Sequence, residues 1–130
     1  MTLAELGALV NGYRQDMTLD VDLAVHGPAR PMPPAAALAL FRTAQEALTN
    51  AVRHAAGAKV EVTLRYDPHL TTLCVENSQP SRPTAVTPDL SHLGGGHGLA
   101  GLRERLEAAG GNLEAGSTGH GWKVEAKMPS

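Results

Sequence analysis

Apolar residues recur at intervals of three and four positions from Leu38 to Gly57, LALFRTAQEALTNAVRHAAG. This spacing places them on one face of an α-helix, which we expect to be its core side. The members of this face are Phe41, Ala44, Leu48, Ala51, Val52 and Ala55. Gly57 lies just past the last of them, where a left-handed C-cap would end the helix. The stretch is therefore the predicted central helix of the fold.

Alternation of apolar and polar positions predicts strands at residues 19–25, 59–66, 70–75, 113–115 and 122–128. Two further helices are predicted, one at 3–13 behind a Thr2-Leu3-Ala4-Glu5 capping box and one at 98–109. Residues 78–96 show no periodicity and predict a long loop of the lid type. The strands come mainly as hairpins. We therefore expect a two-layer α/β (α+β) sandwich, with a mixed, largely antiparallel sheet of about five strands and about three helices on one face.

The length and the charge restrict the function. A chain of 130 residues fits one domain, and a net charge of −2 with interspersed signs argues against nucleic-acid binding. The longest apolar run, Ala35 to Phe41, is too short to span a bilayer, and the first residues lack the basic and apolar regions typical of a signal peptide. We expect a cytoplasmic location without direct membrane contact from this stretch, whether or not a longer protein is anchored. Cys74 lies in an alternating apolar run and is expected to be a buried structural thiol.

Opposite the apolar face of the central helix, Glu46, Asn50 and His54 stand at i, i+4 and i+8. A carboxylate, an amide and an imidazole thus share one stripe. The simplest interpretation is the wet side of an amphipathic helix. Asn50 favours a functional interpretation, because asparagine is unfavourable inside helices and its carbonyl oxygen suits a hard cation such as magnesium.

A glycine-rich stretch, Gly94 to Gly101, leads directly into the third predicted helix. Glycines let a backbone approach a ligand closely, and free N–H groups at a helix start attract phosphates, so a phosphate cradle competes with a flexible loop. Gly96 to Gly101 also matches G-x-G-x-x-G, but no strand precedes it as a dinucleotide site requires. No Walker A lysine follows. A metal site at His92 and His97 is disfavoured, since they lack helical spacing and cysteine partners.

The two stretches together resemble the ATP-binding catalytic domain of sensor histidine kinases, in the superfamily that includes gyrase, Hsp90 and MutL. QEALTNAVRHA resembles the N box of that family. GGGHGLAGLRERL resembles its G2 box, in the form found in kinases that pair with LuxR/NarL-type response regulators. GGNLEAGSTGHGWKVEAKMP is similar to the closing hairpin of actinobacterial-looking members. The resemblance covers roughly Leu19 to Pro129 and implies a Bergerat fold that binds ATP and Mg2+.

Residue roles follow from this resemblance. It implies that Asn50 is a magnesium ligand and that Glu46 polarises an attacking group or orders metal-bound water. The implied phosphate-contacting set comprises Arg53, His54, Gly96, His97, Gly98, Leu99, Gly101 and Arg103. Within this set Gly101 would allow close packing, and Arg103 is the weaker candidate because an exposed helix arginine is commoner.

The adenine-binding box departs from the family pattern. Where the family commonly has Asp-x-Gly-x-Gly, this chain has Val75-Glu76-Asn77-Ser78-Gln79-Pro80. The resemblance places Asn77 at the aspartate position, where its carbonyl oxygen could still accept from the adenine amino group. A neutral acceptor makes a weaker hydrogen bond than a carboxylate, so we expect reduced affinity for ATP.

No histidine in the chain is followed by an acidic residue, the usual context of a phosphoacceptor. We therefore expect residues 1–17 to be a connecting helix from a dimerisation and phosphoacceptor domain, and 18–130 to be the catalytic domain. Alone it would bind ATP and transfer nothing to itself. With its acceptor it would act as a histidine protein kinase upstream of a response regulator. Two alternatives are a stand-alone serine kinase of the anti-sigma-factor type and a degenerate nucleotide-binding or partner-docking module.

Overall fold

The structure is a computed structural model, which describes residues 3–54, 57–78, 98–119 and 121–129. Along these residues the elements are α1 (Leu3–Asp16), β1 (Asp20–His26), α2 (Pro34–His54), β2 (Lys59–Asp67), β3 (Leu70–Ser78), α3 (Gly98–Ala108), β4 (Asn112–Ser117) and β5 (Gly121–Pro129). Every predicted helix and strand is present. The central helix begins at Pro34 rather than at Leu38, because proline fits the first turn of a helix.

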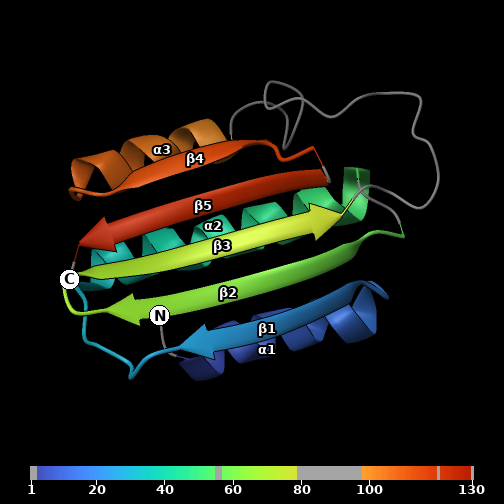
Figure 1. The fold of residues 1–130 in the computed structure, drawn as a ribbon, viewed down its shortest axis with the longest axis horizontal. Coiled ribbons are helices and arrows are strands. Elements are labelled where there is room, and N and C mark those ends of the chain that lie inside the picture. Colours follow the sequence, from blue (N-terminus) through green and yellow to red (C-terminus); the bar gives the residue numbers. More distant parts are fainter. Residues whose placement is uncertain (1–2, 55–56, 79–97, 120, 130) are drawn as a thin grey trace.

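The strands form one sheet in the order β1-β2-β3-β5-β4. β1 and β2 are parallel, with Val21 opposite Val60, and the other neighbouring strands are antiparallel. Parallel neighbours need a crossover connection, and α2 supplies it. Figure 1 shows α1, α2 and α3 together behind the sheet. The predicted two-layer sandwich with a mixed, largely antiparallel sheet is confirmed.

The core lies between the helices and the inner face of the sheet. Val60, Val62 and Leu64 of β2 are fully buried there, against a face of α2 that includes Leu40 and Leu48. Phe41 and Val52 were predicted on that face but are only half-buried. They lie at its edges, because residues next to each other in a helix are rotated by about 100°.

α1 belongs to the same core. Its Leu6 and Val10 are buried in the cluster formed by the other elements. Arg14 donates to the Val21 carbonyl oxygen of β1 through Nε at 3.0 Å and Nη2 at 2.6 Å. The Tyr13 hydroxyl lies 2.5 Å from Thr49 Oγ1 of α2. The first helix is therefore fastened to both the edge strand and the central helix.

The outer face of the sheet carries polar and half-exposed side chains, and no described helix covers it (Figure 1). Cys74 points to this face and is half-exposed, so the expectation of a buried thiol is wrong. The pKa of the Cys74 thiol is raised, mainly by partial burial. The charge of Lys123 lowers this pKa, and the charge of Glu125 raises it. Glu125 also pairs with Lys123 at 3.5 Å and with Lys127 at 3.4 Å.

Among the described helices, none has the length and apolar character needed to cross a membrane.

Candidate functional site

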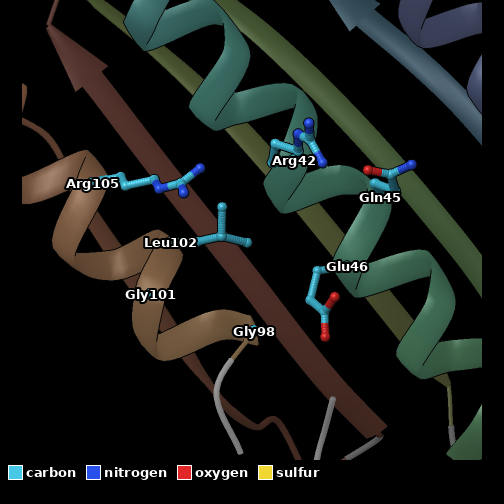
Figure 2. Close-up of a pocket in the computed structure, with 7 residues that line it drawn as sticks. All are labelled: Arg42, Gln45, Glu46, Gly98, Gly101, Leu102 and Arg105. Carbon is cyan, nitrogen blue, oxygen red and sulfur yellow. The ribbon is translucent and has the colours of Figure 1, made fainter. Parts of the chain in front are cut away.

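A groove of about 270 Å3 runs between α2 and α3, and we call it the α2–α3 groove (Figure 2). It is lined by Arg42, Gln45 and Glu46 of α2 and by Gly98, Gly101, Leu102 and Arg105 of α3. Figure 2 shows Glu46 reaching from α2 towards the start of α3 at Gly98. The two stretches singled out in the sequence thus meet in space.

Successive positions of the polar stripe on α2 differ in burial. Arg42 is exposed, Glu46 is half-buried and Asn50 is only 6% exposed. Four residues turn a helix by about 400°, so each step along the stripe rotates the side chain by about 40°. The rotation carries the stripe from the rim of the groove into the protein. The prediction that Asn50 shares a wet face with Glu46 is therefore wrong: Asn50 faces inward.

Asn50 is a polar side chain that is buried in the protein. Neither its Oδ1 nor its Nδ2 makes a hydrogen bond with any residue that the structure describes. An unsatisfied buried polar group costs about 1–3 kcal/mol, so natural proteins rarely keep one without a reason. An inward amide one turn after Glu46 is suited to a ligand atom, and its oxygen fits a hard cation held mainly by phosphates.

Gly98 is the first residue of α3 and packs against Glu46. A Cβ added at Gly98 would lie 2.5 Å from Cδ of Glu46, closer than real Cβ contacts, and 3.1 Å from Cγ, so the Glu46 side chain would have to shift. The next residue, Leu99, is 3% exposed and anchors the start of α3 in the core. The first N–H groups of a helix have no partner within it and attract anions. The carboxylate of Glu46 and the N-terminal end of α3 therefore share one end of the groove.

Gly101 has a different role from the one expected. A Cβ at this position would meet nothing within 4 Å, so close packing does not require glycine here. Gly101 instead borders the α2–α3 groove, where the absence of a side chain leaves space open.

Among the described residues, Arg53 and Asn77 do not line the groove. Arg53 is exposed in the last turn of α2, and His54 ends that helix. Asn77 lies near the end of β3, half-buried, and its Nδ2 donates to the Ser78 carbonyl oxygen at 3.0 Å. Backbone of β5 comes close to it, because a Cβ at Gly121 would lie 2.8 Å from the Asn77 carbonyl carbon. The predicted contacts of Gly96 and His97 lie outside the described residues.

Different arginines face the groove from those the sequence suggested. Nε of Arg103 donates to the Leu113 carbonyl oxygen at 3.1 Å, which ties α3 to β4. Arg42 and Arg105 line the groove instead, and neither was predicted as a site residue. Arg42 could have been found by extending the Glu46 stripe one turn back. Arg105 could not, because only the packing of α3 on α2 brings it to the groove.

The α/β sandwich thus places a buried amide on its central helix near a glycine at the start of a facing helix, an arrangement that suits the binding of a nucleotide. The family model described as "Histidine kinase-, DNA gyrase B-, and HSP90-like ATPase" matches residues 35–130. The chain belongs to this family and is an ATP-binding domain of the histidine kinase type.

Individual relatives agree with this assignment. The chain is 31% identical to the sensor histidine kinase YxjM of Bacillus subtilis over 98% of its own length and 30% of the relative. It is 36% identical to the histidine-protein kinase/phosphatase UhpB of Salmonella typhimurium over 69% of its length and 17% of that protein. It thus spans less than a third of these curated relatives. These likenesses do not favour the stand-alone serine kinase alternative.

Two solved structures share the fold. The catalytic domain of histidine kinase ThkA superposes with a TM-score of 0.68 at 18% identity, covering 99% of this chain and 93% of that one. The Acinetobacter baumannii histidine kinase AdeS superposes with a TM-score of 0.73 at 16% identity, covering 97% and 63%.

Proposed function

We propose that this domain binds ATP together with Mg2+ and presents the γ-phosphate to a histidine on a separate dimerisation domain, as the catalytic part of a sensor histidine kinase. The observation that carries the proposal is the buried amide of Asn50, which has no hydrogen-bond partner in the described part of the chain and lies one turn from Glu46 on the helix that faces Gly98. Such an amide gains its missing partner when a metal ion with phosphates arrives.

Asn50 would contribute one oxygen ligand to the magnesium ion. No group of three or more histidine, cysteine or acidic side chains capable of holding a metal occurs among the described residues. Magnesium bound with a nucleotide typically takes few protein ligands and several oxygens from phosphates and water, so one amide is compatible with this chemistry. When bound, the ion would neutralise charge on the phosphates.

Glu46 and Gly98 would act at the phosphate end. The Glu46 carboxylate would orient the attacking imidazole of the acceptor and accept its proton, since it already lies at the start of α3. Backbone N–H groups at Gly98 and Leu99 would donate to phosphate oxygens. Arg53 and His54 would approach the same phosphates from the end of α2. Positioning and charge neutralisation are the main contributions a protein makes to phosphoryl transfer.

Asn77 would meet the base. Its Oδ1 makes no hydrogen bond with the described residues, whereas its Nδ2 is engaged by Ser78. The oxygen would accept from the adenine amino group. Because a neutral amide replaces a carboxylate, we expect weaker binding of ATP than an aspartate would give.

The partners would be a dimerisation and phosphoacceptor domain of the same kinase and a response regulator of the LuxR/NarL type. α1 would form the connection to the first of these. This role is supported by the contact between α1 and the central helix. The Tyr13 hydroxyl hydrogen-bonds Thr49, which lies in sequence between Glu46 and Asn50. Movement of an upstream domain would reach the site through this contact.

Thermal unfolding with and without Mg-ATP tests the proposal. A ligand at 100 times its dissociation constant stabilises a fold by about 2.7 kcal/mol. We expect such a shift with Mg-ATP and a smaller one when EDTA removes the metal. A domain that serves only to dock partners would melt at the same temperature in all three conditions, and that result would contradict the proposal.

A further inference from the structure

Two guanidinium groups face the α2–α3 groove from opposite walls. Arg105 extends from α3 towards α2, and Arg42 lines the groove on the α2 side (Figure 2). Neither forms an ion pair or hydrogen bond with any residue in the part of the chain that the structure describes. By contrast, Arg14 and Arg103 on the neighbouring surfaces are engaged by backbone carbonyl oxygens. The groove therefore presents two guanidinium groups whose N–H donors are not used by the described residues.

The groove is continuous with the end where Glu46 meets Gly98. Both residues belong to the same lining as Arg42 and Arg105. Arg42 and Glu46 are i, i+4 neighbours, with about 5–6 Å between their Cβ atoms, so a flexible arginine reaches an anion near the Glu46 carboxylate. The charged side chains of the lining are two arginines and one glutamate, which leaves a positive excess.

The groove has room for an anion. Its volume of about 270 Å3 is many times the space that one water molecule needs, so one phosphoryl group with its hydration fits there. Guanidinium groups bind phosphate through paired N–H donors, which a single lysine ammonium cannot reproduce.

We propose that Arg42 and Arg105 bind the terminal phosphate of the nucleotide and so make the domain prefer ATP over ADP. This inference rests on the proposed function and adds the residues that recognise the group to be transferred. Arg42 would hold that group from the α2 side, and Arg105 from the α3 side. An acidic side chain of a partner protein is the competing occupant of the same cations.

The test compares two nucleotides in one titration series. Affinities for Mg-ADP and for a Mg-bound non-hydrolysable ATP analogue are measured calorimetrically for the parent chain, Arg42→Gln, Arg105→Gln and the double variant. Each single variant should lower the ratio of ATP-analogue to ADP affinity about tenfold, the effect of one charge-assisted hydrogen bond, with ADP affinity unchanged. Arg42→Lys and Arg105→Lys should retain part of the ratio.

Arg65→Gln is the matched control, because Arg65 is an exposed arginine of β2 outside the groove. It should leave both affinities unchanged. If the parent binds both nucleotides and the groove variants keep the parent ratio, the inference is wrong and an acidic partner is the better occupant. Equal losses for ADP and the analogue also contradict it. A parent chain that binds neither nucleotide overturns the proposed function itself.

Discussion

Replacing Asn50 with leucine should separate the stability of the empty domain from its ability to bind a ligand. Leucine has the branched shape of asparagine at Cγ but carries no polar atom. Asn50 is 6% exposed, and its two polar atoms lack partners among the described residues. The substitution removes unsatisfied groups that cost about 1–3 kcal/mol each and gains a few tenths of a kcal/mol in helix propensity.

We expect Asn50→Leu to stabilise the ligand-free domain by about 2 kcal/mol after allowing for imperfect packing. For a chain of 130 residues, 1 kcal/mol moves the melting temperature by about 4 °C, so the expected rise is about 8 °C. The same variant should lose the stabilisation by Mg-ATP, because leucine cannot ligate a metal ion. Thermal melts of parent and variant, with and without Mg-ATP, measure both effects.

Thr71→Val is the matched control. Thr71 is fully buried, and its Oγ1 also lacks a partner in the described part of the chain, but the residue lies in β3 outside the groove. It should stabilise the domain by about 1 kcal/mol and leave the Mg-ATP shift unchanged. If Asn50→Leu melts at or below the melting temperature of the parent, the buried amide does not destabilise the ligand-free domain. If it keeps the full Mg-ATP shift, Asn50 is not a metal ligand.

Three further substitutions or measurements test other contacts. Gly98→Ala should have a melting temperature near that of the parent, because the added Cβ meets the end of the flexible Glu46 side chain. It should weaken Mg-ATP binding, because it blocks close approach of a phosphate to the backbone at the start of α3. Unchanged binding in a titration would refute that approach. Tyr13→Phe and Thr49→Val should each lower the free energy of unfolding by about 1 kcal/mol in urea, and the double variant should lose little more than Tyr13→Phe alone. Tyr13→Phe already removes the bond to Thr49, together with the 3.4 Å bond from the Tyr13 hydroxyl to the Gln45 carbonyl oxygen; full additivity would count against the bond between the two hydroxyls. The raised pKa of Cys74 should place the midpoint of its pH-dependent alkylation by iodoacetamide higher in the native chain than in urea, because the thiolate is the reactive form; equal midpoints would contradict this.

The sequence alone was sufficient to predict the secondary structure and the class of the fold. The periods of α2 and β2 come from local geometry, since a helix repeats every 3.6 residues and a strand every two. The spacing of Glu46 and Asn50 and the glycines before α3 were likewise readable without coordinates. These features depend only on residues that are close together in the sequence, so the sequence alone is enough to identify them.

Only the tertiary structure decided which side chains meet. Asn50 turns inward because a four-residue step overshoots one helical turn, and its burial depends on the elements that pack over α2. Cys74 stays half-exposed because the helices that the structure describes all cover the opposite face of the sheet (Figure 1). Arg42 and Arg105 are distant in sequence and share a groove because α3 packs against α2. Burial and contacts between elements depend on packing geometry, which no local pattern encodes.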